Sequence, residues 1–302
     1  DTFVKMIAPL KDKPVVAYLS GATKAKEKRE ILNAVKNGTV DVLIGTHSIL
    51  NVEYNNLGLV VIDEQQKFGA NQREALLDSR KDGRKVDMLS QTATPIPRTT
   101  ALALYGDVEL ITITQKPAGR KENITQWIKK SSDTFLKELV SAEWTHIYNE
   151  IEKGHQVFIV TPAVQEKAKS ASVERTAKIL TRKFPSLKIE YVHGGLDKNQ
   201  QNKKIEEFRD RKSDVLIASS IIEVGIDIPN ATVMLVLDAN RFGASSLHQI
   251  RGRVGRGKDQ GYCYLISDAD SENATRRLQS LVDSNDGFEI AMVDLGTRKE
   301  GD

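Results

Sequence analysis

The stretch LGLVVIDEQQKFG (57–69) contains an apolar run that stops at two adjacent carboxylates, Asp63 and Glu64. A buried strand that ends in an acid pair presents those acids to a metal ion, a phosphate or a water molecule. Phosphoryl transfer from a nucleotide uses one carboxylate near Mg²⁺ and a second group that orients or deprotonates the attacking water. The acid pair suits both roles. The alternative is a solvated strand end with a helix-capping acid.

A second candidate lies in SQTATPIPRTTALALYG (90–106), where Thr92 and Thr94 flank a small residue and two prolines stiffen the adjoining backbone. Two hydroxyls on a rigid loop can sense a phosphate and pass that signal on. The alternative is a helix start with proline near its first turn.

The third candidate is SSIIEVGIDIP (219–229). The hydroxyls of Ser219 and Ser220 could donate to a phosphate, and Gly225 lets the backbone approach a ligand closely. The carboxylate of Asp227 could accept from a ribose hydroxyl. A buried strand followed by a turn explains the same residues.

The fourth candidate is HQIRGRVGRGK (248–258), in which Arg251, Arg253 and Arg256 are spaced through glycines. The guanidinium fork suits bidentate contact with phosphate. An arginine that reaches a nucleotide held by a neighbouring domain can raise the rate by roughly 10³–10⁵. A basic, glycine-rich loop could instead be solvated or bind nucleic acid loosely.

Continuous Val/Ile/Leu runs alternate with helical patterns along the whole chain, which predicts an α/β fold with mainly parallel sheets. The two halves also contain similar segments at a constant spacing. Asp41 and Asp214 are separated by the same number of positions as Gly21 and Gly194. A repeat of this length indicates duplicated domains rather than a solenoid.

The join between the halves is expected near TQKPAGRKENIT, where Pro117 and Gly119 break the pattern. We expect one long amphipathic helix after it, with a cap at Ser132 or Asp133 and a stop at Gly154. A cleft between two domains is the default ligand site. The predicted divisions are a first domain over 1–117, a linker over 118–131, a second domain over 132–284 and a further segment over 285–302.

Composition restricts the class of protein. The chain has 302 residues, of which 39% are hydrophobic and 28% charged, as in globular proteins. The net charge of +3 says little about partners, and no Cys/His spacing suggests zinc. The chain has a single cysteine, Cys263, which cannot form an internal disulfide, so we expect a reducing compartment. Cys263 lies in an apolar run, which indicates a place in the core. No apolar run approaches 18 residues, so we expect no membrane association and a cytoplasmic protein.

Taken in order, an acid pair in one domain and arginines in its duplicate place a nucleotide between two related domains. In this order the sequence resembles the motor of superfamily 2 DNA helicases, and within them the RecG-type family. The motifs that carry the resemblance are GTHSIL, LGLVVIDEQQKFG, TATPIPRTTALALYGD, SSIIEVGIDIPNA, RFGASSLHQIRGRVGRG and DGFEIAMVDL. They cover nearly the whole chain. The transcription-repair coupling translocases share much of this pattern and are the nearest rival.

The resemblance implies two tandem RecA-like, three-layer α/β/α domains, with ATP and Mg²⁺ as cofactors and forked or branched DNA as the partner. Asp63 would hold Mg²⁺ through water, and Glu64 would activate the hydrolytic water. Arg253 and Arg256 would approach the phosphates as catalytic residues. The other implied nucleotide residues are Thr92, Thr94, Gly225, Asp227 and Gln249. The implied DNA-binding residues are Thr46, His47, Arg98, His193, Gly194, Ser219 and Ser220.

Two departures from the family pattern alter the expectation. Gln66 stands where the family usually has a histidine, and glutamine cannot titrate near neutral pH. The phosphate loop G-x-x-x-x-G-K-[ST] occurs nowhere in the chain, so the resemblance implies a motor fragment truncated at the N-terminus of its first domain. We expect this chain alone to hydrolyse little ATP. Residues 285–302 would begin the family's translocation hairpin.

The leading interpretation is a double-stranded DNA translocase fragment from a protein that acts in recombination and repair and is monomeric when intact. A nucleic-acid-binding module without catalysis is the alternative, supported by the basic segment Lys203–Lys212. A metal-dependent hydrolase that uses Asp63 and Glu64 is a third, which lacks further ligands at suitable spacing.

Overall fold

A computed structural model describes residues 2–64, 76, 86–92, 109, 111–113, 119, 121–138, 141–162, 171–219 and 228–299. The chain divides into two compact units, Asp1–Ala93 and Thr94–Asp302. Each unit is described by itself. In the described residues, no helix is long and apolar enough to cross a membrane.

The strands of the first unit form two separate parallel pairs: β1 (Val16–Leu19) with β2 (Val42–Gly45), and β3 (Leu59–Asp63) with β4 (Asp87–Gln91). Its described helices are α1 (Thr2–Ile7), α2 (Ala25–Lys36) and the short 3₁₀ helix η1 (His47–Ile49). A small core joins α2 to β1 through Val35, Leu19 and Val52. The unit therefore has the strand–helix alternation expected from the sequence.

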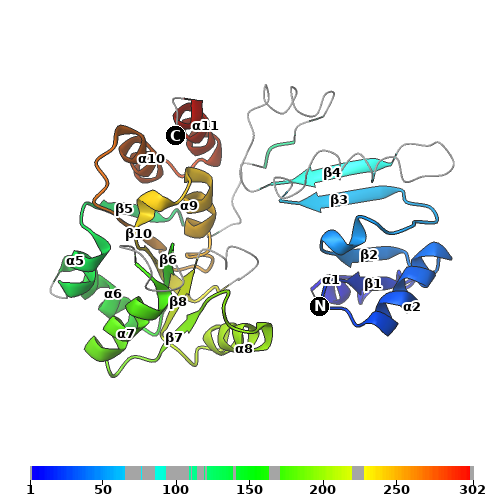
Figure 1. The fold of residues 1–302 in the computed structure, drawn as a ribbon, viewed down its shortest axis with the longest axis horizontal. Helices are drawn as coiled ribbons and strands as arrows, with labels where there is room; N and C mark the ends of the chain where they lie inside the picture. The colour runs from blue at the N-terminus through cyan, green and yellow to red at the C-terminus, as the bar shows by residue number, and fades with distance from the viewer. Residues whose placement is uncertain are drawn as a thin grey trace. The chain divides into compact units, whose positions relative to one another are not determined.

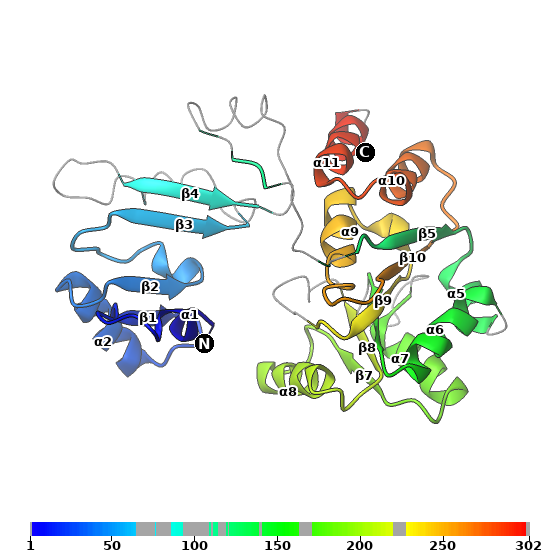
Figure 2. The same ribbon diagram turned by 180° about the vertical axis from the view of Figure 1, so that it is seen from behind.

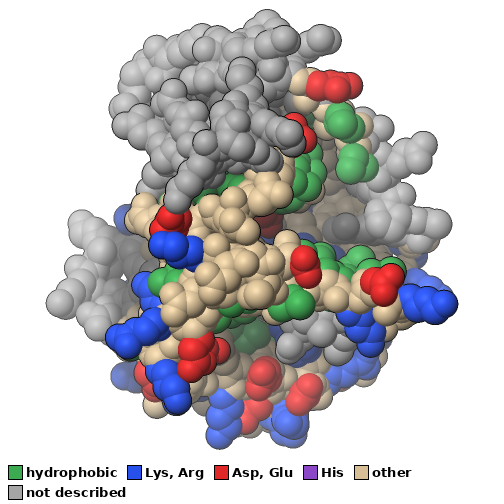
Figure 3. All heavy atoms as spheres, turned by 90° about the vertical axis from the view of Figure 1, so that its right-hand side faces the viewer, with side chains coloured by type: hydrophobic (Ala, Val, Ile, Leu, Met, Phe, Trp, Pro, Cys, Tyr) green, Lys and Arg blue, Asp and Glu red, His purple; other side chains and the backbone are tan. Residues whose placement is uncertain are grey.

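One face of these strand pairs carries exposed apolar side chains. Tyr18 lies opposite Ile44, Val61 lies opposite Leu89, and all four are exposed. Figure 3 shows hydrophobic side chains that reach the surface between charged ones. Parallel sheets are normally covered on both faces, so this exposed apolar surface is unusual for the fold.

The second unit contains one six-stranded, all-parallel sheet with the order β5-β10-β9-β6-β8-β7. Its strands are β5 (Ile124–Ile128), β6 (Gln156–Thr161), β7 (Ile189–Val192), β8 (Val215–Ser219), β9 (Ala231–Val236) and β10 (Tyr262–Ile266). Five of these strands are runs that the sequence predicted. Cys263 lies buried in β10, as expected.

Helices cover both faces of this sheet (Figures 1 and 2). The helices and 3₁₀ turn are α5 (Ser132–Lys137), α6 (Ala142–Glu152), α7 (Val173–Lys183), α8 (Lys198–Arg209), η4 (Ala239–Arg241), α9 (Ala244–Arg251), α10 (Glu272–Asp283) and α11 (Gly287–Lys299). One core packs α5, α6 and α7 on the sheet, and the other packs α8, α9, α10 and α11. The second unit is therefore a three-layer α/β/α domain.

Successive side chains of the central strands point to opposite faces of the sheet and so contribute to two different cores. Val157 and Ile159 of β6 enter the core under α6 and α7, whereas Phe158 and Val160 enter the core on the opposite face. All six residues of β6 are buried. This explains why the strand is a continuous apolar run in the sequence rather than an alternating one.

Two expectations for 118–154 differ from the structure. Ile124–Ile128, expected within the linker 118–131, form edge strand β5, because every residue of the strand pairs with β10. The single helix expected after it is two helices. Ser131 Oγ accepts from Thr134 N, and Ser141 Oγ accepts from Trp144 N, so each serine caps its own helix start.

Candidate functional site

The acid pair lies at the carboxyl end of β3. Asp63 is the last residue of the strand and is exposed. Glu64 follows with a φ of 53°, a left-handed conformation that is uncommon outside glycine. The backbone therefore bends at Glu64 itself.

The parallel register brings a second predicted residue to the same edge. Asp63 is opposite Gln91, the last residue of β4, and Thr92 follows directly. Because neighbouring Cα atoms of paired strands are about 5 Å apart, the carboxylates and the Thr92 hydroxyl belong to one short edge of the sheet. Carboxyl ends of parallel strands are where α/β folds bind their ligands.

This edge fits Mg²⁺ better than a metal that needs a protein cage. Its side chains offer oxygen atoms, and no group of three His, Cys, Asp or Glu residues within the described ranges could hold a metal ion. Mg²⁺ in nucleotide sites takes one or two carboxylates together with water and substrate phosphates.

Thr46 and His47 follow β2 in the first unit, and both are exposed. Thr46 N donates to Leu19 O at 3.3 Å, and Ser48 Oγ donates to the same carbonyl at 3.0 Å. A Cβ at Gly45 would overlap that carbonyl, so only glycine fits there. The GTHS segment is thus held tightly to β1 while Thr46 and His47 face solvent.

In the second unit, the register of β7 and β8 brings His193 and Ser219 to one edge, since Val192 is opposite Ala218. The His193 ring is buried, and its Nδ1 accepts from Gly195 N at 3.1 Å. Ser219 is also buried, and its Oγ has no hydrogen-bond partner in the described part of the chain. Gly194 is exposed. At this edge, the backbone of Gly194 is accessible.

The arginine segment, defined here as residues Arg251–Gly261, starts at the last residue of α9 and ends before β10. Its first arginine differs from the other two. The Arg251 guanidinium is buried, and its Nη1 donates to Leu281 O at 2.7 Å and to Ser284 O at 2.9 Å. Burial lowers the pKa of Arg251. These contacts tie α9 to the end of α10.

Arg253 and Arg256 lie at half-buried positions beyond α9. Arg256 Nε donates to Gly252 O at 3.0 Å, which holds the base of its side chain within the segment. Gln249, on α9, is also half-buried. The sequence could have separated the arginines, because Arg251 is four positions after buried Leu247 and thus on the inner face of α9.

Several predicted residues fall outside the described ones. These are Gln66, Thr94, Arg98, Ser220, Gly225 and Asp227. The acid pair and the arginines belong to different units, and their meeting around one nucleotide stays a prediction.

Comparison with protein families matches the two parts of the chain to two helicase models. Residues 1–102 match the DEAD/DEAH box helicase model, and residues 131–258 match the helicase conserved C-terminal domain. The ATP-dependent DNA helicase RecG of Streptococcus pneumoniae is 38% identical over 95% of this chain, which covers 42% of that relative. RecG of Thermotoga maritima is 41% identical over 95% of the chain, which covers 36% of it.

Solved structures give the same result. The structure of RecG bound to a three-way DNA junction matches 99% of this chain with a TM-score of 0.71 at 37% identity, and the match covers 38% of that chain. Saccharomyces cerevisiae Dbp5 bound to RNA and ADP BeF3 matches 95% of the chain with a TM-score of 0.60 at 17% identity, which shows the fold alone. The common fold is two RecA-like domains. The chain spans about two fifths of the length of the RecG relatives, and both of its units are similar to RecG-type DNA helicases.

Proposed function

We propose that this chain is the motor part of an ATP-dependent double-stranded DNA translocase that remodels replication forks and branched DNA in recombination and repair. The identity of 38–41% to RecG along 95% of the chain is the observation that carries the proposal. The RecG structure bound to a three-way junction supports branched DNA as the partner.

In this proposal, the edge formed by β3 and β4 works on the nucleotide. Bound Mg²⁺ and ATP would supply the electrophilic phosphoryl group and neutralise part of its charge. Asp63 orients water molecules at that site, and Glu64 orients the attacking water and takes up its proton. Thr92 and Thr94 sense the phosphate, and Gly225 and Asp227 face the nucleotide.

The second unit contributes positive charge. Gln249, Arg253 and Arg256 approach the phosphates, and the fork of each guanidinium can contact two phosphate oxygens. Arg251 has no part in this step, because its guanidinium is occupied by the carbonyls of Leu281 and Ser284.

DNA binding is assigned to the strand ends that carry Thr46, His47, His193 and Gly194, together with Arg98, Ser219 and Ser220. Among those of them that the structure describes, the side chains of Thr46 and His47 and the backbone of Gly194 are exposed. Contacts of this kind address the DNA backbone, so binding is independent of sequence and weakens as salt rises.

The test is DNA-stimulated ATP hydrolysis by the full-length protein that contains this chain, on forked DNA and on a linear duplex of the same length. We expect Glu64→Gln to lower kcat by at least about 100-fold, the usual contribution of a general base. Arg256→Ala should lower kcat by roughly 10³-fold or more. Glu30→Gln, which removes the same charge from an exposed position of α2, should leave kcat unchanged.

Three outcomes separate the interpretations. Faster hydrolysis on forked DNA, abolished by Glu64→Gln, supports the proposal. Hydrolysis that survives Glu64→Gln would refute the role of the acid pair. Salt-sensitive DNA binding without any hydrolysis by the full-length protein would instead support the nucleic-acid-binding module. The 302-residue chain alone, which contains no G-x-x-x-x-G-K-[ST] loop, should hydrolyse little ATP under the same conditions.

A further inference from the structure

Asn123, one residue before β5, places its side-chain amide inside the arginine segment. Its Nδ2 donates to Arg251 O at 2.8 Å and to Val254 O at 3.2 Å. These two carbonyls lie on either side of Arg253. A residue far away in the sequence thus fixes the backbone from which Arg253 extends.

The orientation of the Asn123 amide is determined by its neighbours. Both groups that face Nδ2 are carbonyl oxygens, which only accept hydrogen bonds, so the flipped amide would put oxygen against oxygen. The buried Oδ1 has no hydrogen-bond partner within the described residues and faces two glycines. A Cβ at Gly255 or at Gly261 would overlap it. Gly255 also has a φ of +64°, a conformation that favours glycine.

Asn123 is itself anchored to the sheet. The adjacent Ile124 N donates to Gly261 O at 2.9 Å, and β5 then pairs with β10 along its whole length. Asn285 Nδ2 donates to Asn123 O at 3.4 Å. The Gln260 side chain donates to Glu122 O. The amide therefore projects from a fixed strand into an otherwise irregular loop.

We propose that Asn123 is a positioning residue for Arg253 and Arg256, an inference that rests on the proposed contact of these arginines with the ATP phosphates. The Asn123 amide fixes the backbone on both sides of Arg253 through the carbonyls of Arg251 and Val254. Because a misplacement of about 1 Å can cost roughly 100-fold in rate, loss of these two hydrogen bonds should impair hydrolysis without unfolding the unit.

The test uses two variants of the full-length protein and a matched control. Asn123→Asp keeps the size of the side chain but replaces the donor with an oxygen that faces two carbonyls. Asn123→Ala removes both bonds. The control is Gln156→Ala, which removes another buried amide whose Nε2 donates to two carbonyls, Phe208 O at 2.6 Å and Ser213 O at 2.7 Å. Those carbonyls lie outside the arginine segment.

The first measurement is backbone amide hydrogen exchange in the protein without nucleotide. In Asn123→Asp we expect exchange over residues 252–261 to rise by roughly 10-fold, the effect of losing one to two hydrogen bonds. Gln156→Ala should raise exchange near Phe208 and Ser213 and leave 252–261 unchanged. If residues 252–261 of Asn123→Asp exchange at the same rate as in the wild-type protein, the inference is overturned.

The second measurement is DNA-stimulated ATP hydrolysis at a temperature where all variants are folded. Both Asn123 variants should lower kcat by roughly 10–100-fold, with a smaller change in KM for ATP, because the arginines act mainly on the transition state. Gln156→Ala should stay within about 2-fold of wild type. An equal loss of kcat in Gln156→Ala and Asn123→Ala would overturn the positioning role.

The Arg256→Ala variant distinguishes a failure of the positioning role of Asn123 from a failure of the proposed function. If Arg256→Ala hydrolyses ATP like wild type, the proposed role of the arginine is refuted, and the catalytic consequence of Asn123 falls with it. If Arg256→Ala is inactive while the Asn123 variants match wild type, the proposed function stands and only this inference is refuted.

Discussion

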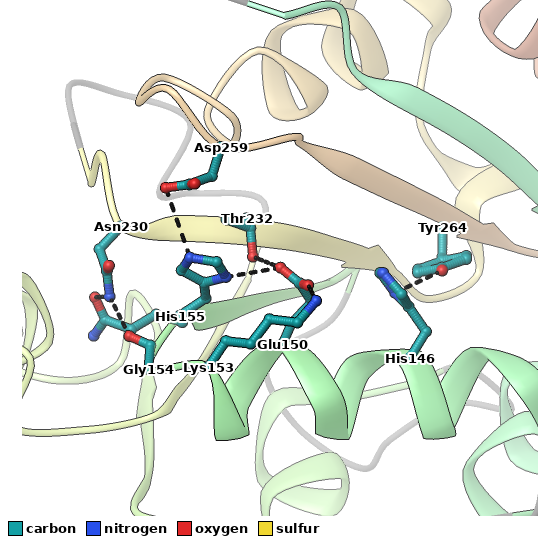
Figure 4. A network of polar contacts seen from close by, with 10 residues as sticks. His146, Glu150, Lys153, Gly154, His155, Asn230, Thr232, Asp259 and Tyr264 are labelled. Atoms are coloured by element: carbon teal, nitrogen blue, oxygen red, sulfur yellow. Dashed lines mark hydrogen bonds and ion pairs between the residues drawn. The ribbon is translucent and has the colours of Figure 1, made fainter.

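Glu150, on α6, is a buried carboxylate that is not one of the predicted nucleotide residues, and it gives a sharp prediction about stability. Its side chain is 5% exposed. One carboxylate oxygen accepts from Thr232 Oγ1 and from His155 Nδ1, each at 2.8 Å, and the other accepts from Lys153 Nζ at 2.8 Å (Figure 4). Burial raises the pKa of Glu150, but these three donors outweigh it and lower the pKa to about 2.

The contribution of this carboxylate to folding follows from its pKa. A shift from 4.5 to about 2 corresponds to about 3 kcal/mol, at 1.36 kcal/mol per unit. Lys153 is 61% exposed, and solvent screening reduces its share, which leaves about 2 kcal/mol. We therefore expect Glu150→Gln, which keeps the shape and removes the charge, to destabilise the second unit by about 2 kcal/mol at pH 7.

The effect has a defined pH dependence. Because the folded pKa lies below the unfolded one, the stabilisation is complete above about pH 4.5 and is lost as the pH falls towards 2. The gap in unfolding free energy between wild type and Glu150→Gln should therefore narrow below about pH 4.5.

Urea unfolding followed by tryptophan emission measures this gap. Both tryptophans of the chain, Trp127 and Trp144, belong to the second unit, so the emission reports that unit alone. Titrations at pH 7 and at several values down to about 3 give the difference at each pH. Glu152→Gln, an exposed change of the same charge on the same helix, is the control and should stay within about 0.5 kcal/mol of wild type. The reasoning fails if Glu150→Gln matches this control, or if the gap stays constant as the pH falls.

Three further changes test other parts of the structure. Arg251→Met should lower the unfolding free energy of the second unit by about 3 kcal/mol in the same titration, since two charge-assisted hydrogen bonds to buried carbonyls are lost; a stability equal to that of wild type would contradict the structural role of Arg251. Burial raises the pKa of the Cys263 thiol to about 12, so a thiol reagent at pH 7 should modify Cys263 only when urea unfolds the protein. Rapid labelling of the native protein would contradict the buried placement of this side chain. Val61→Lys should reduce concentration-dependent light scattering by the 302-residue chain, because Val61 and Leu89 form an exposed apolar pair; unchanged scattering would show that this face does not cause association.

The centre of the sheet of the second unit was predictable because its central strands are buried on both faces. The runs in β6, β8 and β9 are apolar at nearly every position, and all their residues are buried. Such runs can be recognised as strands from the sequence without any knowledge of distant contacts. The register of β3 with β4 then places Asp63 and Thr92 at one edge of this strand pair.

Edge strand β5 was missed because its sequence carries a different signal. Ile124 is exposed and Thr125 is buried, so the strand alternates and includes polar residues. Its existence depends on pairing with β10, which is more than 130 positions away in the sequence. The break between α5 and α6 was missed for a local reason, since the apolar face continues through it and only the cap at Ser141 marks a new start.

The three arginines of one motif show most clearly what the sequence pattern left undetermined. Arg251, Arg253 and Arg256 have the same side chain and similar neighbours, so all three were candidates for phosphate contact, and only the resemblance selected Arg253 and Arg256. Burying a guanidinium is costly unless its donors are satisfied. Nη1 of Arg251 donates to the carbonyls of Leu281 and Ser284 at the end of α10 and also lies against Thr125 Oγ1, and Nη2 lies against His248 Nδ1.

Arg251 and Asn123 then act on the same segment from different sides. The Arg251 side chain ties the start of the segment to α10, and the Arg251 carbonyl is one of the two groups that the Asn123 amide holds. The backbone between these anchors carries Arg253, and Gly255 supplies the left-handed turn that leads to Arg256. One arginine of the motif therefore serves the fold so that the other two start from a fixed backbone. For that reason, replacing Arg251 should impair both stability and hydrolysis, whereas replacing Arg256 should impair hydrolysis alone.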